Sequence, residues 1–320
     1  MKFSKFTRRA KISGFTGLVA IFVGTTSLDA ASVAIGSQMA GPTPFIRLIN
    51  CTINPASAFR TVQFTVASKP GSVVRPVSAL YSADYLQMRG YFNPQNGRLV
   101  LPMFGLYDNY SNTVVLRFGF TDGSFQQQQV AVSTPAWTDP CNVYKNFTPI
   151  QARTASTDLS YDYVLIKSRC STQTPVIIDT DGAVRWVGTG ATVGVFSSAF
   201  FANGIYIASN PPSSSNTTGL ARIELDGTST FLHDYTNWGV TSTNHHNIDP
   251  GKRGIILEVN TSGQVESMIM EVDAFGAVLR TWKLADIIRS AMIAGGDDPT
   301  QFVYPAPNDW FHNNAVTYRA

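Results

Sequence analysis

The chain has 320 residues and a formal net charge of +3, and only 14% of its residues are charged whereas 44% are hydrophobic. Ordinary globular domains carry about 25% charged residues. No basic stripe marks a nucleic-acid-binding surface, so we expect no nucleic acid partner. The length suffices for one large domain or two ordinary ones, and low charge with many small polar and aromatic residues favours an exported β-rich protein.

The N-terminal segment has the layout of a signal peptide. MKFSKFTRRAK supplies basic residues, and the apolar run that follows is short for a membrane span and ends in small residues. We predict a signal peptide over 1–34 with cleavage near Ala30 or Ala34. The protein is then periplasmic or secreted, with no membrane span after cleavage. The pair Arg8-Arg9 also invites a twin-arginine reading, but its neighbours match that signal poorly.

Alternating strands follow the signal segment. In RTVQFTVA the residues Val62, Phe64 and Val66 share one face, and NTVVLRFGFTDGS alternates in the same way before an Asp-Gly turn. GRLVLPMFGLY is a further strand candidate. Short strands separated by Pro and Gly turns, with no long helix, predict an all-β fold that opens with an N-terminal β-sandwich over 35–135.

Residues 136–320 show a repeating pattern. Each unit is an apolar strand, an acidic-glycine turn and a second strand with an aromatic residue, and the turns contain Gly182, Gly227 and Gly276. The steps are 45 residues (182 to 227) and 49 residues (227 to 276). About four strands every 45 residues is the period of a β-propeller blade, so we predict a partial β-propeller here. A run of ordinary hairpins is the simpler alternative.

One segment, LADIIRSAMIAGG, breaks the β pattern. Ile287 and Ala291 lie four residues apart, as do Ile288 and Met292, so the spacing predicts a short helix with Gly295 as its C-cap.

Three cysteines lie outside the signal segment: Cys51, Cys141 and Cys170. An exported protein can oxidise them, and the odd count leaves one free. We expect Cys141 and Cys170 to pair, because both flank the linker and the first propeller strand, although the sequence does not fix the connectivity. No Cys-x-x-Cys pair indicates a metal or redox site, and we expect no metal and no cofactor.

Two histidine-bearing segments stand directly before apolar strands. STNHHNIDP contains His245 and His246, and NDWFHNNAVTY contains His312. Residues that enter the innermost strand of a propeller blade point toward the central channel, so two blades can bring their histidines to one axial pocket. Imidazole can act as a nucleophile or as a general acid and base, and Asn amides donate to anionic oxygens. Such groups suit chemistry on a sulfate or phosphate ester.

A histidine in a β protein is more often a hydrogen-bonded turn residue, and we interpret His233 in this way. His245 and His246 are adjacent, and adjacent strand residues point in opposite directions, so the pair is poorly suited to one metal ion.

Three separated motifs resemble the bacterial aryl-sulfate sulfotransferases: PVIIDTDGAVRWVG, HHNIDPGKRGIILEVN and DWFHNNAVTY. The first region, with KPGSVVRPV and LVLPMFGLYDNYSNTVVLRFGFTDGS, resembles the β-sandwich that precedes the propeller in that family. The resemblance implies a periplasmic enzyme, usually a homodimer. It also implies transfer of a sulfuryl group from an aryl sulfate donor to a phenolic acceptor, through a sulfated histidine and without the adenylylated sulfate cofactor.

The resemblance assigns roles to individual residues. His312 matches the histidine of the family's Trp-x-His motif, and Asn314 matches the sulfate-contacting Asn two places on. His246 matches the upstream catalytic histidine best, although Asn247 stands where an acidic residue usually follows, and His245 stays an alternative contact to substrate. The family's catalytic Arg and nucleophilic His are expected downstream of these 320 residues. The resemblance therefore implies a C-terminally truncated chain with about three of six blades, inactive alone.

Two other functions stay open on the sequence. One is a non-catalytic secreted propeller that binds an anionic or glycan ligand, and the other is a hydrolase acting on sulfate esters. The site assignment requires His246 and His312 to approach one pocket, and it fails if the two histidines lie on opposite faces of the propeller.

Overall fold

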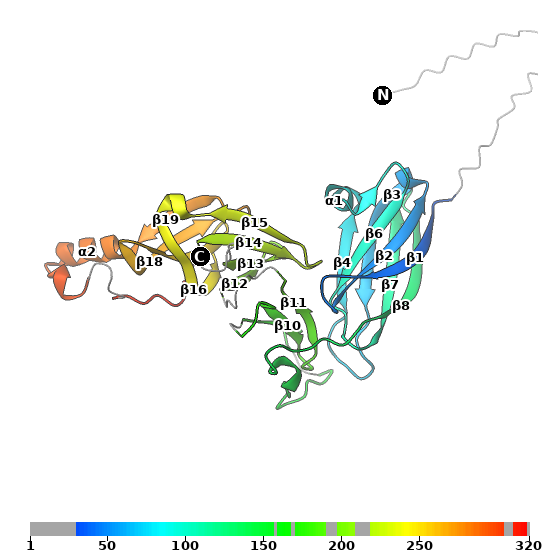
Figure 1. Ribbon diagram of the computed structural model, residues 1–320, viewed down its shortest axis with the longest axis horizontal. Coiled ribbons are helices and arrows are strands. Elements are labelled where there is room, and N and C mark those ends of the chain that lie inside the picture. Colours follow the sequence, from blue (N-terminus) through cyan, green and yellow to red (C-terminus); the bar gives the residue numbers. More distant parts are fainter. Residues whose placement is uncertain are drawn as a thin grey trace, which may run out of the picture. The chain divides into compact units, whose positions relative to one another are not determined.

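The computed structural model describes residues 30–156, 159–167, 170–189, 197–208, 218–303 and 310–318, with the backbone alone described at 243–247, 264 and 266. Antiparallel sheets dominate these segments, which confirms the all-β prediction (Figure 1). In the described part of the chain, no helix combines the length and apolarity needed to cross a bilayer.

Two four-stranded sheets form the N-terminal sandwich. The first has the order β1-β2-β6-β5, with strands at Ser32–Ala40, Ile46–Asn54, Arg98–Phe104 and Phe92–Asn93. The second has the order β4-β3-β7-β8, with strands at Val77–Ser82, Phe59–Val66, Ser111–Phe120 and Phe125–Ser133. A short helix, α1 (Ala83–Met88), follows β4, and the Ser82 hydroxyl caps it by accepting from the Tyr85 amide at 3.1 Å.

Period-two alternation fills the core of the sandwich. Val62, Phe64 and Val66 of β3 are all fully buried, as their spacing predicts, and they pack with the buried face of β7. Strand β1 begins at Ser32, inside the predicted signal segment. Cleavage after Ala30 would leave β1 whole, whereas cleavage after Ala34 would remove its first three residues.

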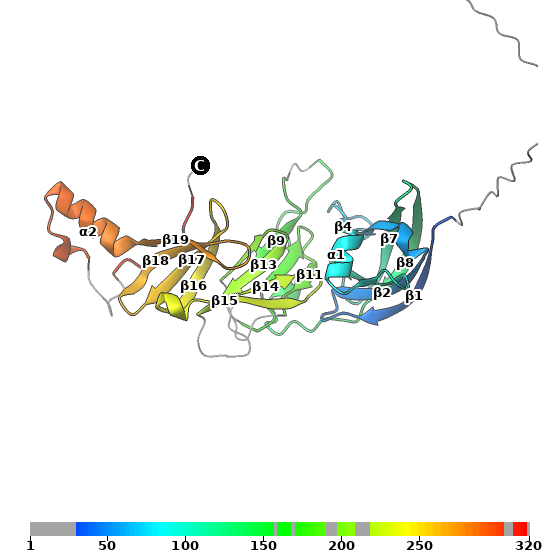
Figure 2. The same ribbon diagram turned by 90° about the horizontal axis from the view of Figure 1, so that it is seen from above.

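Three further antiparallel sheets follow, and in each the strands lie side by side in chain order (Figures 1 and 2). The first holds β9 (Tyr163–Ile166), β10 (Val176–Asp179) and β11 (Val184–Val187). The second holds β12 (Ser198–Phe201), β13 (Gly204–Ala208), β14 (Gly219–Glu224) and β15 (Ser229–Asp234). The third holds β16 (Val240–Pro250), β17 (Ile255–Thr261), β18 (Gln264–Val272) and β19 (Val278–Lys283). Strand β16 packs beside β12 and β13, as neighbouring propeller blades do.

The same turn closes each of these sheets. Its first residue donates its amide to the carbonyl four residues on, and the turn glycine donates back to the first residue's carbonyl. The glycines Gly182, Gly227 and Gly276 have φ values of 88°, 85° and 85°, a region that favours glycine. The predicted repeat is therefore a repeat of structure. The aromatic residue of the repeat differs in its exposure from sheet to sheet: Trp186 is buried, whereas Phe231 is 42% exposed.

An aromatic side chain of one sheet donates a hydrogen bond to the turn of the next sheet. Trp186 Nε1 donates to the Leu225 carbonyl at 3.0 Å, and the Tyr206 hydroxyl donates to the Ala274 carbonyl at 2.8 Å. Leu225 and Ala274 occupy the same place in their turns, one residue after the first. The acceptor is thus the same carbonyl of the turn in both cases, whereas the donors lie on the non-equivalent strands β11 and β13.

The buried Arg185 of β11 joins the first of these sheets to the sandwich. Its Nε and Nη2 atoms donate to the Gly105 carbonyl at 3.0 and 2.6 Å, and its Nη1 atom contacts the Asp179 carboxylate at 3.0 Å. The guanidinium also lies 3.7 Å from the centroid of the Tyr107 ring. One side chain therefore connects two sheets of different domains.

Helix α2 (Leu284–Gly295) follows β19 and confirms the predicted helix. The predicted C-cap at Gly295 is wrong by one residue. Gly296 takes the left-handed conformation, with φ at 85°, and its amide donates to the carbonyls of Met292 and Ile293. Single-turn 3-10 helices lie at Ala56–Ala58, Tyr144–Asn146, Thr236–Trp238 and Pro299–Gln301.

The turn glycines should be less replaceable than glycines of the same conformation in open space. A Cβ atom on Gly276 would lie 2.9 Å from the Cβ of His233, whereas one on Gly296 would meet nothing within 4 Å, and both residues have φ at 85°. We expect Gly296→Ala to lower the free energy of unfolding by about 1–2 kcal/mol, from the left-handed conformation alone. Gly276→Ala should lower it by about a further 1–3 kcal/mol, from overpacking. Equal losses in urea unfolding would contradict this account of the turn.

Candidate functional site

The histidine pair lies in an irregular stretch of β16. Thr243 is opposite Val259 of β17, and Ile248 is opposite Leu257, so residues 244–247 stand opposite the single residue Glu258. Such bulges interrupt the ladder and re-aim side chains, and they are frequent beside active sites. The backbone thus places His245 and His246 in a bulge, while their side chains lie outside the described part of the chain.

Glu258, which faces this bulge, is a residue that the sequence reasoning missed. It is 4% exposed and stands between Leu257 and Val259, whose side chains are fully buried in the core of the third sheet. A buried carboxylate is costly to maintain and is often retained for function. The signal in the sequence was a lone acidic residue inside the apolar strand GIILEVN.

Lys167 occupies the matching place in the first sheet. Strands β9, β13 and β17 start level with the closing turns of their sheets, as shown by Tyr163 opposite Asp179, Gly204 opposite Glu224, and Gly254 one step before the Ile255–Val272 pair. Four residues further along the chain stand Lys167, which directly follows β9, Ala208 of β13 and Glu258 of β17. The repeat therefore places a lysine and a glutamate at equivalent positions in the first and third sheets.

Lys167 also lies within electrostatic range of the end of β16. Partial burial lowers the pKa of its ammonium group, and the Asp249 carboxylate acts in the opposite direction. Asp249 in turn accepts a hydrogen bond from the Val316 amide at 2.9 Å. Asp249 at the end of β16 thus contacts the C-terminal segment and acts electrostatically on Lys167, which follows β9.

The C-terminal segment carries the other predicted site residues. His312 is exposed and has a φ of 48°, and the Asn314 side-chain amide donates to the His312 carbonyl at 3.4 Å. The neighbouring Asn313 is the more suggestive amide, because its Nδ2 atom is buried and has no hydrogen-bond acceptor in the described part of the chain. The approach of His312 to the His246 side chain stays a prediction.

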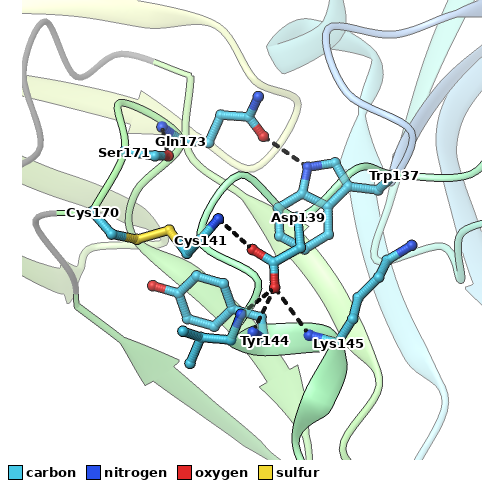
Figure 3. Close-up of a disulfide and its surroundings, with 9 residues drawn as sticks. Trp137, Asp139, Cys141, Tyr144, Lys145, Cys170, Ser171 and Gln173 are labelled. Carbon is cyan, nitrogen blue, oxygen red and sulfur yellow. Dashed lines mark hydrogen bonds between the residues drawn. A yellow bond between two sulfur atoms is a disulfide. The ribbon is translucent and has the colours of Figure 1, made fainter.

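A disulfide and a carboxylate hold the linker that precedes the first of these sheets (Figure 3). Cys141 is bonded to Cys170, with their Cα atoms 5.8 Å apart. The Asp139 carboxylate accepts from the amides of Cys141, Val143, Tyr144 and Lys145 at 2.6–3.1 Å. Partial burial would raise the pKa of Asp139, but these donors outweigh it and hold the pKa below its ordinary value. Since Cys170 is three residues beyond Lys167, the disulfide helps to fix where the chain leaves β9.

The fold and the site define a class: a β-sandwich followed by propeller-type sheets, with histidines on the first strand of one sheet and on a neighbouring segment. The Arylsulfotransferase Ig-like domain matches residues 52–135, and Arylsulfotransferase (ASST) matches residues 146–320. The second match covers more than half of the chain, so the chain belongs to the arylsulfotransferase (ASST) family. The resemblance seen in its motifs is thereby confirmed.

Comparison with curated proteins gave no match. Among solved structures, wild-type OgpA from Akkermansia muciniphila is similar in two crystal forms, at 13% and 14% identity with a TM-score of 0.24 for both. These matches cover 33% of this chain and 28% and 30% of OgpA. Catalytically inactive OgpA in complex with the O-glycopeptide glycodrosocin matches at 13% identity and a TM-score of 0.23, over 34% of this chain and 31% of that one. The chain thus spans less than a third of the length of these structures.

The thiols should differ sharply in reactivity. Burial raises the pKa of Cys51 to about 12, and the side chain is 2% exposed, so the native protein should not react with iodoacetamide at pH 8. Unfolding without a reductant should release one reactive thiol, that of Cys51, with Cys141 and Cys170 recovered as a linked peptide. Labelling of the native chain, or of Cys141 in the unfolded chain, would contradict this assignment.

Lys167 should contribute to anion binding. We expect Lys167→Met to weaken the binding of inorganic sulfate about tenfold or more, because a hydrogen bond to a charged group contributes about 1.5–3 kcal/mol. Lys283→Met, at an exposed lysine before α2, is the matched control and should change little. Binding to the unaltered chain should also weaken as pH rises through the lowered pKa of Lys167, below the pH at which an ordinary lysine loses its charge. Calorimetry across this range would contradict the role if both variants behaved alike.

Proposed function

We propose that this protein is an aryl-sulfate sulfotransferase that moves a sulfuryl group from an aryl sulfate to a phenolic acceptor. The observation that carries the proposal is the family match over residues 146–320, together with a histidine bulge beside an anchored His-Asn segment. In the proposed ping-pong reaction, the S–O bond to the first phenol breaks as a histidine nitrogen bonds to sulfur. The second phenol then takes the sulfuryl group from that nitrogen, with no adenylylated cofactor.

The residues of the site suit the charges of this reaction. Sulfuryl transfer spreads negative charge over three oxygens, so donors and a cation must surround the sulfur. The buried amide of Asn313 has no acceptor in the described part of the chain, and Lys167 supplies a positive charge, beside the family-matched Asn314. A phenol has a pKa of about 10, so the leaving phenolate benefits from a proton that His312 or His246 could supply.

The resemblance implies export and dimerisation as well. We infer a periplasmic or secreted protein from the basic and apolar layout of residues 1–34, and the Cys141–Cys170 disulfide suits an oxidising compartment. A homodimer belongs to the same proposal.

His312 should bind the donor. We expect His312→Ala to weaken the binding of 4-methylumbelliferyl sulfate about tenfold or more, through loss of a hydrogen bond to a charged group. His246→Ala should act likewise. His233→Ala is the matched control, because His233 of β15 packs against Tyr235, with tilted rings whose centroids are 4.8 Å apart, and belongs to no motif of the site. Equal weakening by all three variants would overturn the site.

Product analysis separates the three functions. A transferase forms a sulfated acceptor when 4-methylumbelliferyl sulfate and 1-naphthol are both present, a hydrolase releases umbelliferone without acceptor, and a binding protein does neither. The family's nucleophile matches no histidine of these 320 residues, so we expect them to bind the donor without turnover. Release of umbelliferone that depends on acceptor would contradict that expectation and would support the transferase, whereas release without acceptor would favour the hydrolase.

A further inference from the structure

A cavity of about 640 Å³ lies between the sandwich and the first two of the propeller-type sheets. Strands β4 and β6 supply one wall, and β9 to β12 supply the other. Its lining is largely aromatic and aliphatic and includes Phe104, Tyr161, Tyr163, Leu165, Trp186 and Phe200. Binding sites for drug-sized ligands have this character and span about 300–1,000 Å³.

Hydrogen bonds hold the two walls in a fixed relation. Arg185 donates from the sheet side to the Gly105 carbonyl of the sandwich. The Tyr163 hydroxyl donates to the Arg75 carbonyl, and the Arg75 guanidinium pairs with Asp162. The cavity is therefore a fixed part of the junction between the sandwich and the first of the propeller-type sheets.

The charged groups and the indole of the lining already have partners. All three nitrogens of Arg185 have acceptors, in Gly105 and Asp179. The Trp186 indole donates to the Leu225 carbonyl, and Arg75 pairs with Asp162. Arg185 pairs with Asp179, Arg75 shares Asp162 with Arg153, and the rest of the lining is mostly aromatic and aliphatic, so the lining favours a neutral ligand.

Two aromatic rings of the lining remain half exposed. Phe200 of β12 and Tyr161 before β9 are each 51% exposed. Flat rings stack on or meet the edges of such side chains at favourable energy. The exposed surface of these two rings therefore favours an aromatic ligand.

We propose that this cavity binds a neutral, flat aromatic molecule of one or two rings, of the phenol class. The site is separate from the proposed sulfuryl site, because no residue of β16 or of 310–318 lines it. The proposal goes beyond the sulfotransferase function and does not depend on it, since binding here needs neither His312 nor a sulfate group. The aromatic lining would contact a phenol in the same way whether that phenol is a substrate, a product or an unrelated metabolite.

Calorimetric titration of the 320-residue chain with 2-naphthol tests the proposal. We expect saturable binding, weakened by about twofold to tenfold in Phe200→Ala and in Tyr161→Ala, as loss of one aromatic contact predicts. Phe231→Ala is the matched control, because Phe231 lies on β15 of the same sheet, is 42% exposed and does not line the cavity. His312→Ala should also leave naphthol binding unchanged.

Two further results would decide the proposal. 2-Naphthyl sulfate should not displace 2-naphthol in the His312→Ala variant, because the cavity offers no unpaired cation to its sulfate. Absence of naphthol binding, equal weakening by Phe231→Ala, or displacement by 2-naphthyl sulfate would overturn the proposal. If Phe200→Ala does not fold, Tyr161→Ala gives the same comparison. Loss of sulfate-ester binding with retained naphthol binding would count against the sulfuryl site alone.

Discussion

The buried pairing of Arg185 with Asp179 is the interaction on which the junction of sandwich and sheets depends. Their side chains are 1% and 0% exposed, and removing such charges from water costs several kcal/mol per ion. The cost is offset because Arg185 also donates to the Gly105 carbonyl and lies over the Tyr107 ring, while Asp179 accepts from the amides of the turn. Removing either partner would leave an uncompensated buried charge in a place where two domains meet.

The pairing is an addition to a turn that all three sheets share. Asp179 and Asp273 occupy the same position, and each accepts from the amides two and four residues on. That capping stabilises the turn and explains why an acidic residue recurs there. In the second sheet Glu224 takes this position and instead pairs with Arg222, which is only 18% exposed. The acidic residue therefore stabilises the turn. In the first sheet the same residue, Asp179, also pairs with Arg185, which contacts the sandwich.

Much of this architecture was predictable because period and turn chemistry are local. The buried face of β3, the glycine turns at a step near 45 residues and the helix at 284–295 follow from neighbours in sequence. The capping glycine of α2 was misplaced because Gly295 and Gly296 satisfy the same local rule, and the position that reaches φ of 85° depends on where the last turn of the helix ends. The sandwich contact of Arg185 was not predictable, since it joins residues 80 apart in sequence.

The candidate site was predictable in its motifs and unpredictable in its supporting charges. His312 and the histidine pair stand out because histidine is rare here, whereas Lys167 and Glu258 look ordinary until strand register places them at equivalent positions. A lysine and a glutamate at one level of the first and third sheets have a physical consequence. An ammonium group favours a nearby anion, whereas a carboxylate disfavours it. The candidate site would therefore be more favourable to an anion on the side of the first sheet than on the side of the third.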